Sequence, residues 1–299
     1  MSSNTIFYNM KRIFVTWATG NIWSAVLKFL WYLNSHHEVI AWVREIAKAK
    51  KKLWEYKNIS YTEFDFTKTQ TFEYALDNIT TIFLLRPPEF ANIESQFKPF
   101  LEVAQKKWVK KVVFLSVQWA EKSPMIPHHK IEKLILDMNF EYIFMRPAYF
   151  IQNLIGSLLI EIQKNKIITL PAGKAKFNWI DVQNIAELWA IFLTQFEQYK
   201  NKAYTITGTE NKNFYEIADV MTKVLNEKIS YKSVNPLSFI LKKKQQWMPM
   251  SFVFIMTILH LIPRFTSEPE ILDTYKKITD KNPTTIREFI KRERKIFCI

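Results

Sequence analysis

The first half of the chain alternates short apolar runs with segments whose apolar residues recur every three or four positions. The runs are short, so they are predicted as strands: 12–16, 38–43, 59–64, 80–85, 111–116 and 141–145. The first reads as a buried strand, and 59–64 alternates apolar and polar residues. The segments between them have helical spacing: 21–33, 46–54, 71–76, 93–107 and 129–138. Strands linked by helical crossovers predict an α/β fold with a doubly wound parallel sheet, which binds ligands beyond the carboxyl ends of its strands.

The pattern after residue 150 is less regular. It predicts extended pieces at 167–171 and 179–182, a strand at 203–207, and helices at 184–193 and 214–225. Because no linker rich in Pro, Gly or Ser separates the halves, the second is not expected to be independent. We expect residues 10–150 to form a Rossmann domain and residues 151–299 to complete the fold as a small subdomain that covers the substrate pocket.

The longest apolar stretch, 248–262, is interrupted by Pro249, Ser251 and His260. It is shorter than the ~20 residues that a membrane-spanning helix needs. We therefore expect a buried helix or a hydrophobic lid over a pocket, and no membrane insertion.

The net charge of +14 comes from 42 basic and 28 acidic residues, and 34 of the basic residues are lysines spread along the chain. Lysines spread in this way indicate a general richness of the chain in lysine more than a nucleic-acid site. We therefore expect no nucleic-acid partner. The single cysteine, Cys298, excludes a disulfide framework and a cysteine-built zinc site. No metal is expected, and a cytoplasmic setting fits because residues 1–9 lack an apolar leader.

The loop after the first predicted strand has the spacing of a dinucleotide-binding loop but lacks two of its glycines. The fingerprint places glycine at the tight turn, at the pyrophosphate and at the helix–strand contact. Gly20 is retained, whereas Trp17 and Trp23 occupy the first and third places. The whole chain has 4 glycines and 10 tryptophans, although average usage of ~7% predicts about 21 glycines.

With glycine at 17 and 23 the loop would read TGATGNIG, which resembles the loop of the NmrA-like family of atypical short-chain dehydrogenases. Further segments resemble that family in order and spacing: 39–44 (VIAWVR), 64–66 (FDF), 82–88 (IFLLRPP), 116–120 (SVQWA), 146–150 (RPAYF), 177–182 (FNWIDV) and 284–289 (TTIREF). The resemblance covers most of the chain. It implies a Rossmann fold, an NAD(P)H cofactor and oxidoreductase chemistry.

Against this family, tryptophans stand repeatedly where glycine is expected. They are at 17, 23, 42, 108 and 119, and also at 31, 54, 189 and 247, where glycine would be unsurprising. Only Trp179, inside FNWIDV, stands where the family pattern fits a tryptophan. We therefore interpret nine tryptophans as replaced glycines, encoded by TGA codons that the host reads as Gly. The alternative is a diverged protein that acquired aromatic residues and lost its cofactor.

The resemblance implies a set of cofactor-binding residues: Thr16, Trp17, Thr19, Gly20, Asn21, Ile22, Arg44, Asp65, Phe66, Leu85, Arg86, Pro87, Ser116, His128, Pro147 and Phe150. Arg44 stands where NAD-preferring folds carry an acidic residue, so NADP(H) is expected to be preferred over NAD(H). The alternative for Arg44 is a solvated surface position. Asp65 would accept a hydrogen bond from the adenine amino group, or it would cap the residues from Thr67 onward.

The Tyr-x-x-x-Lys pair of most short-chain dehydrogenases is absent. Lys130 would need a tyrosine at position 126, which is Ile126. Alignment from Glu132 instead puts His128 at the lysine place, where it would bind the nicotinamide ribose or relay a proton. Otherwise His128 is a polar residue at a helix N-terminus. With Ser116 and Tyr149, His128 and Lys130 complete the catalytic candidates. Tyr149 and Phe150 would line the nicotinamide and substrate pocket, or serve as core aromatics.

Two functions remain open at this point. One is an NAD(P)H-dependent reductase of quinone-like or other small carbonyl substrates, because a quinone needs little general acid catalysis. The other is a non-catalytic protein that senses NADP(H) and regulates a partner. A small-molecule substrate is expected in the first case, and a monomer or homodimer in either.

Overall fold

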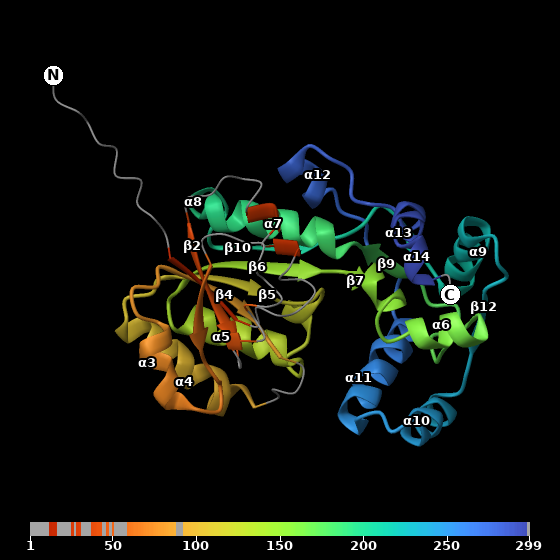
Figure 1. Ribbon diagram of the computed structural model, residues 1–299, viewed down its shortest axis with the longest axis horizontal. Helices are drawn as coiled ribbons and strands as arrows, with labels where there is room; N and C mark the ends of the chain where they lie inside the picture. Colours follow the sequence, from red (N-terminus) through yellow and green to blue (C-terminus); the bar gives the residue numbers. More distant parts are fainter. Residues whose placement is uncertain are drawn as a thin grey trace. The chain divides into compact units, whose positions relative to one another are not determined.

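The computed structural model describes residues 12–16, 25–26, 28–30, 37–43, 46–47, 50, 59–87 and 92–297. They divide into two compact units (Figure 1). The first unit consists of the chain up to Arg146 and of Ala186–Tyr204. The second consists of Pro147–Ile185 and the chain from Thr205 onward.

The first unit is built on a seven-stranded sheet with the order β10-β6-β5-β4-β1-β2-β3. Its strands are β1 (Arg12–Val15), β2 (Glu38–Val43), β3 (Ile59–Glu63), β4 (Thr81–Leu85), β5 (Lys111–Leu115), β6 (Glu141–Pro147) and β10 (Lys202–Ile206). All pairs from β3 to β6 are parallel. Phe14 of β1 pairs with Ile40 on one side and Ile82 on the other. The predicted doubly wound sheet is confirmed, and its order reverses at β1.

Helices cover both faces of this sheet. They are α3 (Phe72–Ala75), α4 (Ile93–Lys106), α5 (Pro127–Asp137), α7 (Val182–Thr194) and α8 (Phe196–Tyr199), with short 3-10 turns at Thr69–Thr71 and Ala120–Lys122. Figure 1 shows α3, α4 and α5 on one face and α7 on the other. The start of α4 is set by Asn92, whose side chain accepts a hydrogen bond from Ser95 N. Pro127 occupies the first turn of α5, where a missing N–H costs nothing.

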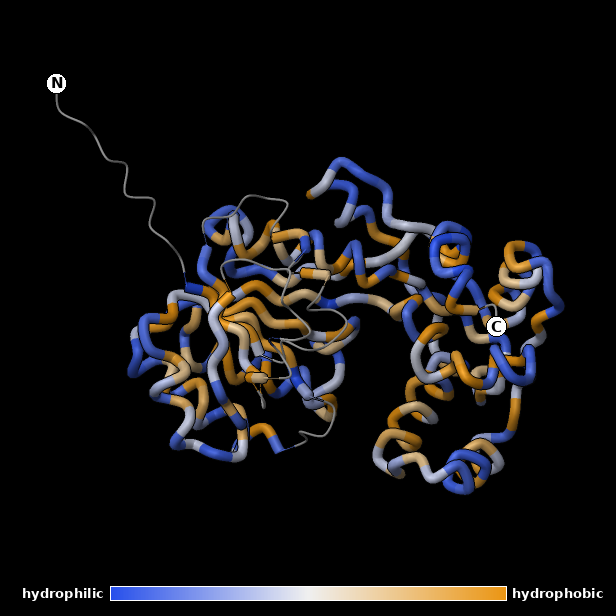
Figure 2. The backbone as a smooth tube through the Cα atoms, viewed as in Figure 1, coloured by the Kyte–Doolittle hydropathy of each residue, from blue (hydrophilic) through white to orange (hydrophobic). Residues whose placement is uncertain are grey.

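Aromatic side chains form much of the core between the sheet and α4. The ring centroids of Phe14 and Phe64 are 5.4 Å apart, and those of Phe66 and Phe100 are 5.3 Å apart. These are edge-to-face arrangements, which aromatic rings favour. The central strands of this sheet are coloured mostly as hydrophobic in Figure 2, as expected for strands that are buried on both faces, whereas the edge strands β3 and β10 are partly exposed.

The second unit combines two small sheets with several short helices. One sheet has the order β11-β9-β7, and the other pairs β12 with β8. Its strands are β7 (Tyr149–Phe150), β8 (Ile167–Leu170), β9 (Phe177–Ile180), β11 (Asn211–Lys212) and β12 (Ser230–Ser233). Its helices are α6 (Leu159–Asn165), α9 (Phe214–Leu225), α10 (Pro236–Gln245), α11 (Met250–Leu261), α12 (Thr274–Thr279), α13 (Ile286–Arg292) and α14 (Arg294–Phe297), with 3-10 turns η3 (Ile151–Leu154) and η4 (Ile262–Phe265).

A buried carboxylate joins distant parts of the second unit. Asp181 follows β9 and is fully buried. Its Oδ1 accepts from Gln152 Nε2 at 2.6 Å and from Gln183 N at 2.9 Å, while its Oδ2 accepts from Arg292 Nη1 at 2.8 Å. A buried charge needs such partners. The last turn of α13 is therefore tied to the end of β9.

Helix α11 confirms the predicted helical segment but not its burial. Only Val253, Met256, Thr257 and His260 of this helix are buried. Leu261 is half-buried, and its other large side chains are exposed. Among the described residues, no helix is long and apolar enough to cross a membrane.

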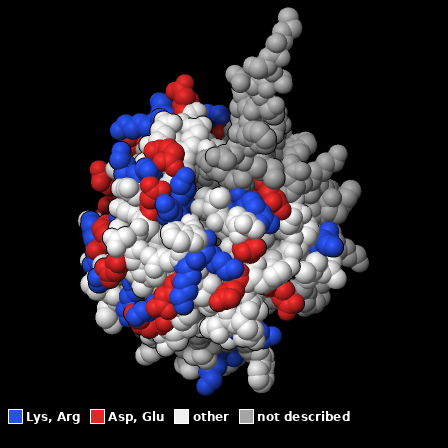
Figure 3. All heavy atoms as spheres, turned by 90° about the vertical axis from the view of Figure 1, so that its left-hand side faces the viewer, with Lys and Arg blue, Asp and Glu red and all other residues white. Residues whose placement is uncertain are grey.

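Surface charge on the first unit is mixed. On the face shown in Figure 3, Lys and Arg side chains lie among Asp and Glu side chains. Several lysines are paired: Lys107 with Asp77 and Lys133 with Asp137, for example. This distribution supports composition as the source of the positive charge.

Three of the suspect tryptophans have a backbone conformation that favours glycine. The described residues include nine non-glycine residues with positive φ, and five of these are Asn or Asp, which tolerate it. Three others are Trp108 (φ 62°), Trp119 (φ 65°) and Trp247 (φ 58°). Trp108 directly follows Lys107, the C-cap of α4, at the position where a left-handed glycine commonly ends a helix.

Trp189 and Trp179 differ sharply in how their rings are accommodated. The Trp189 ring centroid lies only 3.3 Å from that of Phe83, closer than the usual 4.5–7 Å. Its Nε1 has no hydrogen-bond partner in the described structure. Trp179 is also buried, but its Nε1 donates to Lys212 O at 2.9 Å and its ring meets Phe214 at 5.3 Å. The buried ring of Trp42 lies edge-on to Phe64 and Phe66, and Trp42 Nε1 points to Phe64 O.

We predict that Trp108→Gly and Trp247→Gly each raise the free energy of unfolding by about 1 kcal/mol, because a left-handed conformation strains a residue with a Cβ. The control Trp179→Gly should lower it by about 3 kcal/mol or more, because it empties a packed site. Urea unfolding of the three variants measures both effects.

A loss of stability in Trp108→Gly and Trp247→Gly would contradict the interpretation of these positions as glycines. The coding DNA gives an independent check. The recoding hypothesis requires TGA at the nine suspect positions and TGG at Trp179, so TGG at all ten would contradict it.

Candidate functional site

The carboxyl ends of β1 and β4 meet where the strand order reverses, and Thr16 joins them. Thr16 directly follows β1 and is fully buried. Its Oγ1 accepts from Leu85 N at 2.8 Å and lies 3.2 Å from Phe83 O, to which it can donate. Thr16 N also donates to Phe83 O at 3.1 Å. The start of the first crossover is thereby fixed against the end of β4.

Arg86 places a cation at the end of β4. Leu85 and Arg86 are half-buried and Pro87 is buried. Arg86 Nη1 donates to Pro87 O at 3.1 Å. The guanidinium lies close enough to His128 to influence its pKa. The predicted site residues of β4 and α5 are therefore near one another.

Ser116 follows β5 with a buried hydroxyl. Ser116 N donates to Met145 O at 2.7 Å, which continues the pairing of β5 with β6. Its side chain is almost completely buried, and Oγ has no hydrogen-bond partner in the described part of the chain. Buried polar groups normally have a partner. This hydroxyl is suited to bind a polar group of a ligand.

His128 lies in the first turn of α5 and is neutral at physiological pH. Its ring is stacked on Phe114, with centroids 5.9 Å apart and planes inclined by 27°. Burial, and secondarily the charge of Arg86, lowers the pKa of His128 to about 3. Lys130, two residues further along the helix, is exposed. The structure therefore does not place Lys130 beside Ser116 or His128.

An ion pair that the sequence analysis missed holds α5 against β6. Arg146 Nε and Nη2 donate to the two carboxylate oxygens of Glu132, at 2.9 and 2.5 Å. Arg146 Nη1 lies 2.9 Å from Glu121 Oε2. Burial opposes the charged state, but the bonds to Glu132 prevail and raise the pKa of Arg146. Because Glu132 is one helical turn from His128, this pair orients the helix that carries His128.

Asp65 and Phe66 have local roles in the structure. Asp65 Oδ1 accepts from Thr67 N at 2.9 Å and from Thr67 Oγ1 at 2.7 Å, in agreement with the cap alternative. The ring of Phe66 is buried in the core, 4.9 Å from Phe64. A cofactor would meet Phe66 through its backbone only.

Several predicted cofactor residues lie outside the described residues: Trp17, Thr19, Gly20, Asn21, Ile22 and Arg44. Their roles stay predictions. Within the described ranges, no three His, Cys, Asp or Glu side chains are grouped as they would be around a metal ion.

In the second unit, Tyr149 is bonded to a histidine that sequence reasoning missed. Tyr149 Oη and His260 Nε2 are 2.9 Å apart, and His260 Nδ1 is 2.6 Å from Met256 O. Because a carbonyl only accepts, Nδ1 carries the proton and Nε2 accepts from Tyr149. Burial lowers the pKa of His260 to about 4 and raises the pKa of Tyr149. A lone histidine in an apolar helix gave no signal of this pair.

Aromatic rings surround the Tyr149–His260 pair. The Tyr149 ring lies 5.1 Å from Phe177 and 4.8 Å from Trp179. Phe150 is half-buried, and Pro147 is buried at the end of β6. The roles expected for Pro147, Tyr149 and Phe150 stay predictions.

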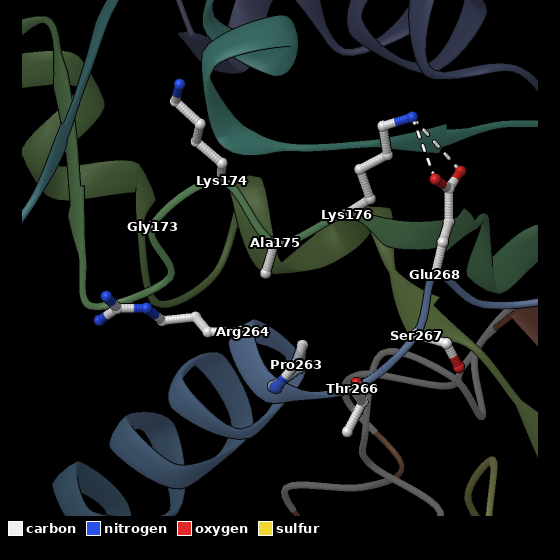
Figure 4. A pocket seen from close by; sticks show the side chains of 9 residues that line it. All are labelled: Gly173, Lys174, Ala175, Lys176, Pro263, Arg264, Thr266, Ser267 and Glu268. Atoms are coloured by element: carbon white, nitrogen blue, oxygen red, sulfur yellow. Dashed lines mark hydrogen bonds and ion pairs between the residues drawn. The ribbon is translucent and has the colours of Figure 1, made fainter.

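A separate cavity of about 550 Å³ lies in the second unit (Figure 4). Its lining comes from the β8–β9 loop and from the segment that follows α11: Gly173, Lys174, Ala175, Lys176, Pro263, Arg264, Thr266, Ser267 and Glu268. Lys176 is paired with Glu268 at 3.1 Å. The Arg264 side chain extends beside Gly173, and the Lys174 side chain points away from Arg264. None of the predicted site residues lines this cavity.

Comparison with known proteins gives one family. The sequence profile of the NmrA-like family matches residues 9–290. The chain is 27% identical over 227 residues to prestalk A differentiation protein A of Dictyostelium discoideum, covering 76% of this chain and 74% of that protein. It is 23% identical over 284 residues to an NAD(P)H azoreductase of Xenophilus azovorans, covering 93% of this chain and 96% of that protein.

Solved structures share the fold. The triphenylmethane reductase of Citrobacter sp., complexed with NADP(H), superposes with a TM-score of 0.83 at 21% identity, covering 94% of this chain and 99% of the other. The NADPH-dependent quinone oxidoreductase QOR2 of Escherichia coli, complexed with NADPH, also gives 0.83, at 20% identity and the same coverage.

The two neutral histidines, half-buried His128 and buried His260, should make the protein acid-sensitive. Their pKa values are lower in the folded than in the unfolded protein, so the unfolded state binds more protons below about pH 6.5. The free energy of unfolding therefore decreases as the pH is lowered. Between pH 7 and 5 each of them should cost about 2 kcal/mol of unfolding free energy, on an order-of-magnitude basis.

Urea unfolding at several pH values measures this slope. His260→Gln should remove about half of it, whereas the control His129→Gln, at a histidine that bonds to Ala120 O, should retain it. A slope that is identical in the parent and in His260→Gln would contradict the burial of a neutral His260.

Proposed function

The chain belongs to the NmrA-like family, and on this premise we propose that it is an NAD(P)H-dependent reductase of quinone-like or other small, electron-poor carbonyl compounds. Its relatives support this proposal: one is named an NAD(P)H azoreductase, and two structural neighbours are a triphenylmethane reductase and a quinone oxidoreductase. The names describe a transfer of reducing equivalents from a nicotinamide cofactor. They favour a reductase over a regulatory protein.

The observation that carries the proposal is the set of polar groups at the carboxyl ends of β1, β4 and β5. Arg86 supplies a cation, Ser116 an unpaired buried hydroxyl, and His128 a neutral imidazole. A nicotinamide nucleotide offers phosphates, ribose hydroxyls and a carboxamide, which match these three groups in kind. Arg86 and Ser116 follow β4 and β5, at the carboxyl edge of the sheet where this fold binds its ligands, and this position supports the proposal.

The bound cofactor would supply a hydride, and the chain's own residues would bind and orient the cofactor and the substrate. Neutral His128 can both donate and accept a hydrogen bond, so it suits the nicotinamide ribose. The Ser116 hydroxyl can donate to a carboxamide or substrate carbonyl. No Tyr-x-x-x-Lys acid is present, so an electron-poor substrate, whose reduced oxygen is a weak base, fits best.

A preference for NADPH rests on Arg44. A charge-assisted contact with the 2′-phosphate would contribute about 1.5–3 kcal/mol. The high positive charge of the chain would also attract a phosphorylated cofactor. We therefore infer NADPH as the preferred reductant.

We predict that the variant carrying Trp17→Gly and Trp23→Gly oxidises NADPH in the presence of simple quinones, and that adding Ser116→Ala raises the KM for NADPH by about fivefold or more, equivalent to a lost hydrogen bond. Steady-state loss of NADPH absorbance measures both. Ser95→Ala, on the exposed side of α4, is the matched control. NADPH binding without turnover of any quinone would instead support a sensor.

We also predict that Arg44→Glu, in the same glycine background, weakens NADPH binding about 10- to 100-fold and leaves NADH binding nearly unchanged. Titration calorimetry with both cofactors measures the ratio. The control is Arg287→Glu on the exposed surface of α13. If the glycine variant with an unchanged Arg44 bound NADPH and NADH with equal affinity, this would contradict a role of Arg44 in cofactor selection.

A further inference from the structure

Helix α11 and the η4 turn present an apolar surface to solvent. We define the outward face as its large exposed side chains: Met250, Phe252, Phe254, Ile255, Ile258, Leu259, Ile262 and Phe265, with exposed fractions from 36% to 79%. A continuous exposed apolar surface of this kind marks an interaction site. It extends along the whole of α11, which Figure 2 shows as hydrophobic over most of its length.

The distribution of side chains on α11 is the reverse of that in an ordinary surface helix. Its packed face contains two polar residues, Thr257, which bonds to Val253 O at 2.8 Å, and His260, which bonds to Tyr149. On its exposed side the only polar residue is Ser251, in the first turn. A surface helix normally has charged or polar residues there. The outward face is therefore built for an apolar environment.

The segment that contains this face has an excess of positive charge. Residues 228–267 include six basic residues and no Asp or Glu, although the chain has 28 acidic residues. Two of the six, Lys242 and Lys243, pair with Glu161 of α6. Exposed cations stand beyond both ends of α11. Lys244 lies near the end of α10, six residues before α11, and Arg264 lies in η4, three residues after it. This contrasts with the mixed charge of the first unit (Figure 3).

The cavity of the second unit lies at the same end of α11 as Arg264. Three cations, Lys174, Lys176 and Arg264, and one carboxylate, Glu268, line it together with the hydroxyls of Thr266 and Ser267. Because the carboxylate neutralises only Lys176, the lining has an excess of positive charge. A phosphate-bearing headgroup matches that lining.

From these observations we propose that the outward face of α11 and η4 binds peripherally to a membrane surface containing anionic phospholipids. The apolar side chains enter the boundary between headgroups and acyl chains, and Lys244 and Arg264 remain at the level of the phosphates. The 12 residues of α11 span about 18 Å at 1.5 Å per residue, so the helix lies in the interface plane. This proposal does not depend on the proposed reductase activity.

The test is flotation of the full chain with vesicles of phosphatidylcholine, with and without phosphatidylserine. We expect binding to the vesicles that contain phosphatidylserine, weakened several-fold by their omission or by high salt. The double variant Phe254→Ser/Ile258→Ser should bind about tenfold or more weakly. Lys244→Gln/Arg264→Gln should lose the dependence on phosphatidylserine.

The matched control is Ile160→Ser, which removes an equally exposed apolar side chain from α6 of the same unit. It should bind vesicles like the parent. Thermal unfolding verifies that the serine variants fold. Quinone reduction by the same variants in the Trp17→Gly/Trp23→Gly background, without vesicles, reports separately on the proposed reductase.

Three results would overturn the proposal. The first is an absence of vesicle binding by the parent. The second is a dimer in sedimentation that Phe254→Ser/Ile258→Ser dissociates, which would assign the face to a second copy of the chain. The third is a changed KM for quinone in that variant with unchanged vesicle binding, which would assign the face to the substrate.

Discussion

The hydrogen bonds of Thr16 hold the end of β1 against the end of β4, where the strand order of the first unit reverses. A doubly wound sheet places its ligand site where neighbouring crossovers leave in opposite directions. At that point β1 must be held against β4 beyond the last regular pair. The Thr16 hydroxyl does this by accepting from Leu85 N and contacting Phe83 O. Arg86 then follows in a defined position, and the groups on β5 and α5 can be arranged around it.

The parallel sheet was predictable because its central strands are buried on both faces and are therefore almost wholly apolar, while the edge strand β3 alternates apolar and polar residues. The strand at 38–43 was predicted to the residue, and that at 111–116 is one residue shorter in the structure. Long-range polar contacts were not predictable. Arg146 and Glu132 are fourteen residues apart, and Tyr149 and His260 are 111 apart. No local pattern records which polar groups a fold brings together.

Of the two alternatives for residues 248–262, the buried helix is wrong, whereas the hydrophobic lid over a pocket stays a prediction. An apolar segment between polar ones is normally a core element, because most apolar surface is removed from water. The sequence 248–262 is apolar on most sides of a helix, and periodicity cannot then distinguish a packed face from an exposed one. Thr257 and His260, the polar residues expected to mark an outer face, are buried.

The two units are interleaved along the chain, and this has a consequence for how the protein is made. The strand β10 and the helix α8 of the first unit are synthesised after Pro147–Ile185 of the second. The cation that pairs with buried Asp181 is Arg292, 111 residues further along the chain. During translation the first unit cannot close before Pro147–Ile185 of the second unit has emerged, and the carboxylate of Asp181 lacks its cation until α13 has been made. A chain that stalls before β10 would therefore leave two incomplete cores instead of one finished unit.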